Sequence, residues 1–173
     1  MSARTFAVFI VVLAALGVLG FGLIKKSDEA IAVGDSAPQP GLTELSSGAP
    51  ASLEDYRGRW TLVNFWSSWC EPCRAESVDL QAFSDAHPET VVVGVNLEDA
   101  SDDARGFVSE FELTYPQLRA TDSSSAREDY GMIARPENFL IDPAGKVAYI
   151  QRGPVDEKIL RERIEPLIAG EPQ

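Results

Sequence analysis

The stretch LVNFWSSWCEPCRAES, residues 62–77, decides the fold and holds the chain's only two cysteines, Cys70 and Cys73. Its first five residues form the near-continuous apolar run typical of a strand that is covered on both faces. Two serines follow, and the pattern then becomes that of a helix. We therefore predict a buried strand, a short connection and a helix whose first turn carries both cysteines.

The Cys-x-x-Cys spacing at a helix start favours a disulfide that opens and closes. The first turn brings the two sulfurs near each other, while its free N–H groups and the helix dipole stabilise a thiolate on Cys70. We predict that Cys70 is the nucleophile. Cys73, one turn further in, is expected to be more shielded and to attack the mixed disulfide, which releases the product.

Two other uses of the cysteine pair are a metal site and a static structural disulfide. A zinc site wants about four ligands, and the chain offers only these two thiols and the single His87. A structural disulfide usually closes a long loop. A disulfide between cysteines only three positions apart stabilises the folded protein little. The pattern therefore favours a redox-active pair that needs no metal and no other cofactor.

The length and composition fit one domain of ordinary size with an appendage. The chain has 173 residues, of which 45% are hydrophobic, and this is enough for a real core. A formal charge of −12 argues against a nucleic-acid partner, which needs clustered Lys and Arg. We interpret the acidity as a solvated surface, although it would also suit cationic partners.

An uncharged apolar stretch, residues 6–24, stands near the N-terminus. It is long enough to cross a bilayer as a helix, and it is longer than the apolar part of a typical cleaved signal peptide, which is the alternative. We predict a membrane anchor over residues 1–26, a linker over 27–33 and the domain over 34–173. Because disulfides form outside the cytoplasm, we expect a single-pass protein of the inner membrane with its domain on the periplasmic side.

The remaining chain alternates strands with helices and ends on a hairpin and a helix. Ser101 is expected to cap its helix, and Pro166 to kink or end the last one. This order predicts an α/β fold of the thioredoxin-like kind, a mixed central sheet flanked by helices, with the cysteines at the carboxyl end of a central strand. The predicted strands are 62–66, 90–97, 115–118, 138–141 and 146–152, and the predicted helices are 53–56, 70–86, 101–111, 125–130 and one that begins near 156.

The chain resembles the membrane-anchored thioredoxin-like reductases of the TlpA/ResA/CcmG group. The similarity covers about residues 34–168 and includes NFW at 64–66, the WCEPC motif at 69–73, Glu76, LTYP at 113–116 and the segment 136–145. The resemblance implies an enzyme that reduces disulfides of partner proteins in an oxidising compartment, most often those of apocytochrome c before haem attachment or those of a copper-site protein. It also implies that another membrane protein supplies the electrons.

The resemblance assigns further site residues outside the cysteine pair. Pro136 aligns with a proline that the family holds in the cis form beside the cysteines, where the backbone of the preceding residue can pair with a substrate strand. The predicted substrate-contact residues are Trp69, Pro72, Arg135 and Pro136.

Glu76 matches an acidic residue that the family places near its active site. Cys70, Cys73 and Glu76 follow one another three apart along the helix, and Glu76 projects on the apolar side, between Leu80 and Phe83. A partly desolvated carboxyl there would have a pKa raised toward neutrality and would suit proton transfer to and from the cysteines. The alternative is an ordinary solvated helix glutamate.

Three positions depart from the family pattern. Val78 stands where a helix-kinking proline is usual, Arg135 precedes the cis-type proline, and Asn138 replaces a usual threonine. A cation at Arg135 could stabilise the Cys70 thiolate or select an acidic substrate. Equally, its head group could lie in solvent.

Two other functions stay open on the sequence. A thiol peroxidase of related fold is suggested by Ser67, three residues before Cys70, while the close Cys73 and Trp69 argue against it. A Cu(I)-binding chaperone, or a reductase for copper-site assembly, would use both thiolates, although two methionines and one histidine are few for copper.

Overall fold

The computed structural model of the protein describes residues 31–170. The predicted membrane anchor, residues 1–26, lies outside this range. Within residues 31–170 no helix is both long and apolar enough to cross a membrane. Ile31 is buried in the core of the domain, so the packed structure already includes the end of the predicted linker.

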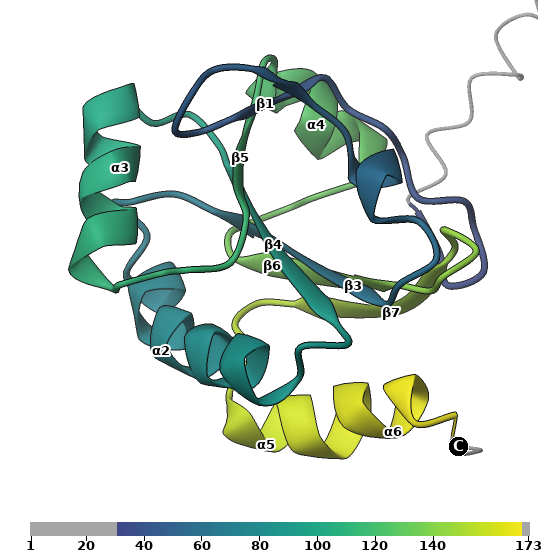
Figure 1. The fold of residues 1–173 in the computed structure, drawn as a ribbon. Helices are drawn as coiled ribbons and strands as arrows, with labels where there is room; N and C mark the ends of the chain where they lie inside the picture. The colour runs from purple at the N-terminus through teal and green to yellow at the C-terminus, as the bar shows by residue number, and fades with distance from the viewer. Residues whose placement is uncertain (1–30, 171–173) are drawn as a thin grey trace, which may run out of the picture. The chain divides into compact units, whose positions relative to one another are not determined.

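Strand β3 (Thr61–Trp66) lies at the centre of the sheet, as its apolar sequence predicts (Figure 1). All six of its residues are buried. It pairs in parallel with β4 (Val91–Asn96) on one side and antiparallel with β6 (Glu137–Ile141) on the other. Every position of β3 is therefore enclosed by neighbouring strands and by the layers above and below the sheet, which explains the near-continuous apolar run.

The complete sheet has seven strands in the order β2-β1-β5-β4-β3-β6-β7. β4 and β5 are parallel, whereas β1 pairs antiparallel with both β5 and β2, and β6 pairs antiparallel with β7. The prediction of a mixed sheet with a terminal hairpin is confirmed. The strands not yet bounded are β1 (Leu42–Glu44), β2 (Pro50–Ala51), β5 (Gln117–Ala120) and β7 (Val147–Arg152).

Alternate side chains of β3 enter two separate cores, one on each face of the sheet. Leu62 and Trp66 pack with the cysteines and with residues of α2, α3 and the C-terminal helix. Val63 and Phe65 pack on the opposite face, where α4 and the turn η1 cover the sheet. The helices are α2 (Glu71–Ala86), α3 (Ser101–Glu110), α4 (Ser123–Asp129) and the 3-10 turn η1 (Leu53–Tyr56).

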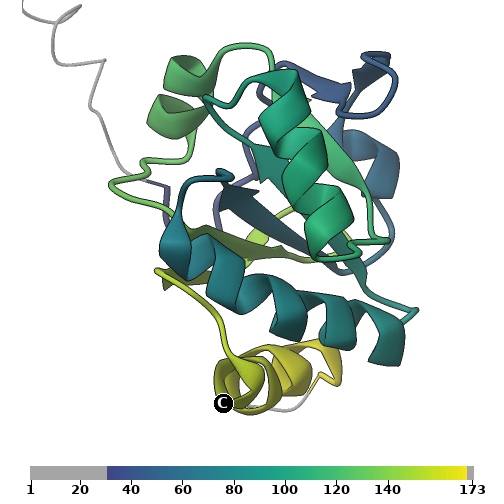
Figure 2. The same cartoon turned by 90° about the vertical axis from the view of Figure 1, so that its left-hand side faces the viewer.

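The C-terminal helix lies beside α2 in both views (Figures 1 and 2). It consists of α5 (Glu157–Ile159), a π-helical turn η2 (Leu160–Ile164) and α6 (Glu165–Ile168). Pro166 does not end it, because the helix continues through Ile168. The π-helical turn directly before the proline is the kind of local change that accommodates a residue without an N–H.

Two predictions about the β4 to β5 connection need correction. Ser101 does not cap α3, because its hydroxyl accepts a hydrogen bond from Arg119 and the N-cap position is Ala100. β5 begins at Gln117, two residues later than predicted. Tyr115 instead packs into the core at the end of α3, and Pro116 contributes only its carbonyl, to the N–H of Gly94.

The sequence did not predict β1 and β2. Both are very short, and they lie in a region rich in Pro, Gly and Ser that predicts turns. Their pairing with each other and with β5 makes them strands, and periodicity cannot reveal elements of this length.

Candidate active site

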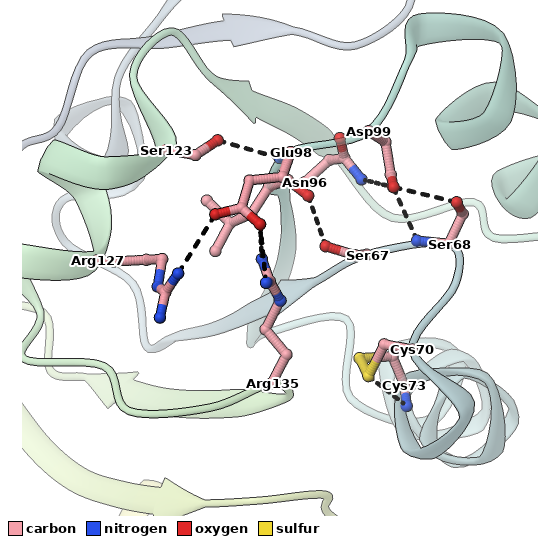
Figure 3. A network of polar contacts seen from close by, with 11 residues as sticks. Ser67, Ser68, Cys70, Cys73, Asn96, Glu98, Asp99, Ser123, Arg127 and Arg135 are labelled. Atoms are coloured by element: carbon pink, nitrogen blue, oxygen red, sulfur yellow. Dashed lines mark hydrogen bonds and ion pairs between the residues drawn. A yellow bond between two sulfur atoms is a disulfide. The ribbon is translucent and has the colours of Figure 1, made fainter.

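The two cysteines occupy the first turn of α2, as predicted, and are joined in a disulfide (Figure 3). Cys70 is the N-cap residue, and its Sγ accepts a hydrogen bond from the backbone N–H of Cys73 at 3.3 Å. Cys70 is 5% exposed and Cys73 is 1% exposed. The helix N-terminus therefore favours negative charge on Cys70, and Cys70 is the less deeply buried residue of the pair.

The loop before the cysteines is held by Asp99, a buried residue just after β4 (Figure 3). The Asp99 carboxylate accepts hydrogen bonds from the backbone N–H of Ser68 at 2.7 Å and from the Ser68 hydroxyl at 3.1 Å. The Ser67 hydroxyl donates to the carbonyl of Leu97. These contacts hold the backbone of the Ser67–Ser68 connection before Cys70. The hydroxyl of Ser67 therefore has a structural role.

Glu76 is buried one turn beyond Cys73, with 1% of its surface exposed. Burial raises its pKa from 4.5 to about 7, although hydrogen bonds from Val155, Asn138 and Asn64 act in the opposite direction. The raised pKa predicted from the apolar side of the helix is confirmed. The carboxyl titrates near neutrality, where a group can both accept and release a proton.

Two asparagines from neighbouring strands orient the Glu76 carboxyl. Asn64 of β3 donates one N–H to Glu76 Oε1 at 2.6 Å and the other to the side-chain oxygen of Asn138 at 2.9 Å. Asn138 of β6 donates to Glu76 Oε2 at 3.1 Å, and the backbone N–H of Val155 donates to the same oxygen at 3.0 Å. The departure at Asn138 thus supplies a donor directly to the acidic residue.

The peptide bond between Arg135 and Pro136 is cis, in agreement with the form that the resemblance implies. Within residues 31–170 the backbone N–H and C=O of Arg135 have no hydrogen-bond partner. The following residue, Glu137, is fully buried and accepts hydrogen bonds from the backbone N–H groups of Ile133 and Ala134, at 2.9 and 3.2 Å. Glu137 thereby fixes the loop that presents Arg135.

The Arg135 side chain does not lie in solvent, since only 11% of it is exposed. Its guanidinium carbon lies 4.6 Å from the centroid of the Trp69 ring. Its two terminal nitrogens donate to Glu98 Oε2 at 3.0 and 2.9 Å. Arg127 donates to the other oxygen of Glu98 at 3.3 Å, so one carboxylate lies between two arginines (Figure 3).

A groove of about 370 Å³ runs beside the disulfide. Three predicted contact residues, Trp69, Pro72 and Arg135, line it together with Cys70. Pro136 is buried and does not line the groove, and Glu76 belongs to the core on the sheet side of α2. The remaining lining residues are Glu71, Arg127, Ile133 and Ala134.

A larger cavity of about 740 Å³ lies between β5 and the end of α3, lined among others by Leu45, Val108 and Leu113. It does not touch the disulfide, so its size alone does not make it the site of the chemistry. Among residues 31–170 no group of three or more His, Cys, Asp and Glu side chains is arranged to hold a metal ion.

The sequence reasoning missed Glu98, Asp99 and Glu137. Glu98 and Asp99 directly follow the buried strand β4, and the carboxyl ends of parallel strands β3 and β4 meet at one edge of the sheet. Because active sites of such sheets lie at the carboxyl ends of the strands, this placement would have predicted both acids beside the cysteines. Glu137 had no such signal, because a glutamate at a strand start is normally exposed.

The chain is similar to known thiol-disulfide oxidoreductases. The AhpC/TSA family matches residues 33–150. The thiol:disulfide interchange protein HelX of Rhodobacter capsulatus is 38% identical over 79% of this chain and 77% of its own, and the thiol-disulfide oxidoreductase ResA of Geobacillus thermodenitrificans is 29% identical over 92% of each. The crystal structure of a putative thiol:disulfide interchange protein DsbE from Chlorobium tepidum is 27% identical, covers 82% of this chain and 98% of its own, and superimposes with a TM-score of 0.70.

Proposed function

The chain belongs to the AhpC/TSA family and is a thiol-disulfide oxidoreductase of the TlpA/ResA/CcmG type, and from this premise we propose that it reduces disulfides of partner proteins on the outer side of a membrane. The observation that carries the proposal is the disulfide between Cys70 and Cys73 in the first turn of α2. Cys70 lines a groove where a partner can bind, and Cys73 does not.

The first step of the reaction is attack on the partner's disulfide. In the reduced enzyme the Cys70 thiolate, stabilised by the start of α2, attacks one sulfur of that disulfide. A mixed disulfide forms between Cys70 and the partner, and the partner's second sulfur leaves as a thiolate that takes up a proton.

The second step releases the partner and restores the Cys70–Cys73 disulfide. Cys73 loses its proton and attacks the Cys70 sulfur, and the partner's first sulfur leaves as a thiolate that takes up a proton from the solvent. Two electrons have then moved from the enzyme to the partner. Glu76 lies one turn from Cys73 on the same side of α2, and its pKa of about 7 suits it to accept the proton of Cys73.

The proposed location indicates that electrons flow from this protein to its partner. In a compartment where disulfides form readily, a domain of this type is useful as a source of electrons for selected thiols. We propose that residues 6–24 anchor the chain in the inner membrane and that another membrane protein re-reduces it. The proposed partners are apocytochrome c before haem attachment or a copper-site protein, and the exchange itself requires no cofactor.

Trapping in cells tests this proposal. Cys73→Ala removes the second step, so the partner should stay bound to Cys70 through a disulfide that dithiothreitol releases. Cys70→Ala is the matched control, because it retains a single cysteine at the same helix start. Mass spectrometry identifies what is held. If Cys73→Ala retains no more protein than Cys70→Ala does, the chain does not act on protein disulfides.

The other two functions have direct tests. The names of the relatives favour thiol-disulfide exchange over peroxide reduction and over copper delivery. A peroxide-consumption assay of the reduced protein tests the thiol peroxidase, and Cu(I) titration of the reduced protein tests the chaperone.

A further inference from the structure

Two asparagines lie directly opposite each other on neighbouring strands, on the face of the sheet that α2 covers. Asn64 of β3 and Asn138 of β6 are partners in the antiparallel register, and they are 3% and 0% exposed. The residues that follow them, Phe65 and Phe139, pack in the core on the other face, so both amides point toward α2. A buried amide is costly unless it is hydrogen-bonded, and these two are bonded to Glu76 and to each other.

The orientation of the two amides is fixed by these bonds. Asn64 donates one N–H to Glu76 Oε1 at 2.6 Å and the other to Asn138 Oδ1 at 2.9 Å. Asn138 donates to Glu76 Oε2 at 3.1 Å and to the carbonyl of Gly153 at 3.2 Å. A flipped Asn138 would place its NH₂ group against the NH₂ group of Asn64, so its amide has only one orientation.

Asn138 also joins Glu76 to the connection between β7 and α5. Gly153 in this connection accepts from Asn138, and two residues later the backbone N–H of Val155 donates to Glu76 Oε2 at 3.0 Å. Gly153 is itself held, since its own N–H donates to the carbonyl of Pro136 at 3.1 Å. Asn138 therefore supplies one donor to the carboxyl and anchors the segment that supplies a second.

The donors identify the oxygen that carries the proton of Glu76. Each carboxylate oxygen has two lone pairs. Asn138 and Val155 occupy both lone pairs of Oε2, whereas within residues 31–170 Oε1 accepts only from Asn64. A proton therefore binds to Oε1, and each donor to Oε2 favours the ionised carboxylate.

Few titratable groups face Glu76. On α2, Cys73 precedes it by one turn. Tyr115 packs in the same core and stays neutral, because burial raises the pKa of its hydroxyl and the charge of Glu76 raises it further. Three more acidic side chains are near in sequence, but they line the outer groove of α2, form an ion pair on the other face of the sheet or cap α5: Asp79, Glu137 and Asp156. Burial and hydrogen bonds therefore decide whether Glu76 is ionised.

We propose that Asn138 is a positioning residue for the second step of exchange, which orients Glu76 so that Oε1 receives the proton of Cys73 and which sets the pH at which it can do so. In that step the proton passes from Cys73 Sγ to Glu76 Oε1, and the Cys73 sulfur forms a bond to the Cys70 sulfur. The bond from Cys70 to the partner breaks with its electron pair on the partner's sulfur. Glu76 then releases the proton to solvent. The inference rests on the proposed function, because it concerns a step of that reaction.

Two substitutions of the same shape separate the hydrogen bonds of Asn138 from its size. Asn138→Val removes both donors, and a hydrogen bond to an ionised group is worth enough to move its pKa by about one unit. Asn138→Thr keeps one O–H donor, which can bind Glu76 or Gly153 but not both. The pH at which Glu76 ionises should therefore rise in Asn138→Val, and the value for Asn138→Thr should lie between those of Asn138→Val and the wild type.

The first measurement is an infrared titration of the oxidised full-length protein, in which the disulfide keeps the cysteines from titrating. The band of the protonated Glu76 carboxyl is identified by its absence in Glu76→Gln. Its midpoint should lie near pH 7 in the wild type and about one pH unit higher in Asn138→Val. Leu140→Val is the control, because Leu140 lies on the same strand and in the same core without a hydrogen bond to Glu76, and it should leave the midpoint unchanged.

The second measurement follows the second step by stopped flow, with reduced protein and an excess of dithiobis(nitrobenzoate). This reagent leaves as a coloured thiolate that needs no proton, first when Cys70 is modified and again when Cys73 displaces it. The rate of the second release does not depend on reagent concentration, and its midpoint in pH should rise in Asn138→Val as that of the carboxyl does. In a Glu76→Gln background the same substitution should leave the midpoint unchanged, because it acts only through the carboxyl.

The outcomes separate this inference from the proposed function. If the reduced wild-type protein does not reduce insulin, the proposed function fails. If it does, and the carboxyl of Asn138→Val titrates as in the wild type, exchange stands and the role of Asn138 is refuted. A midpoint that moves for the carboxyl but not for the second release, or that still moves without Glu76, refutes it as well. If Asn138→Val does not fold, the comparison of Asn138→Thr with the wild type decides in the same way.

Discussion

Glu76→Gln should remove a pH dependence of stability that the wild-type protein owes to a single buried carboxyl. The pKa of Glu76 is about 7 in the folded protein and 4.5 when solvated. As the pH rises between these values, Glu76 ionises in the unfolded chain but stays protonated in the folded one. The folded state then binds more protons, so the free energy of unfolding falls with rising pH. Above pH 7 both states are ionised and the loss is complete.

The magnitude follows from the shift of the pKa. A rise from 4.5 to about 7, at about 1.4 kcal/mol per pH unit, corresponds to roughly 3 kcal/mol. Glutamine also has a cost that does not change with pH, because the donors Asn64, Asn138 and Val155 all face the carboxyl and one of them meets an NH₂ group. The test therefore follows the free energy of unfolding of Glu76→Gln minus that of the wild type as the pH changes. Its value at a single pH also contains the constant cost of glutamine.

Urea unfolding of the oxidised protein measures this quantity. The chain from Ser27 onward is suitable, and a cooperative transition will establish that it is folded. Between about pH 4.5 and 7.5, the free energy of unfolding of Glu76→Gln minus that of the wild type should rise by about 3 kcal/mol. Contributions that the two proteins share cancel in this difference, and the disulfide prevents the cysteines from titrating. A difference that stays constant within about 0.5 kcal/mol would refute the buried, nearly neutral carboxyl.

Three further predictions concern the cysteines, the N-terminus and the loop at the cis peptide. A limiting amount of alkylating agent should modify reduced protein at Cys70 well before Cys73, as peptide mapping will show, and equal labelling would contradict the assigned roles. Removal of residues 1–26 should leave a soluble domain that still reduces insulin, and an insoluble or inactive product would argue against the anchor. Glu137→Gln should lower the free energy of unfolding by about 2 kcal/mol, because it removes the charge that pairs with Arg152, and an unchanged urea midpoint would show that this pair contributes nothing.

The chemistry of the site could be predicted from a single stretch of sequence because it depends on neighbouring residues. The apolar run of β3, the loop and the first turn of α2 lie within residues 62–77, and helix geometry alone places Cys70, Cys73 and Glu76 one turn apart. For Glu76 the apolar pattern of the helix left a solvated glutamate open, and the family resemblance favoured the buried carboxyl with a raised pKa that the structure has. The spacing along the helix is local, so it could be derived before any contact was known.

The surroundings of these residues were decided only by tertiary structure. Arg135 is 37 positions from Glu98, and Asn138 is 62 positions from Glu76, so no periodicity relates the partners. The sequence therefore left three possibilities for Arg135, and only the fold shows a cation held between the Trp69 ring and a carboxylate. The physical reason is that electrostatic and stacking energies depend on distances through space and on burial. Those distances are fixed by the order and direction of strands in the sheet, which bring the carboxyl ends of β3 and β4 together with the start of β6.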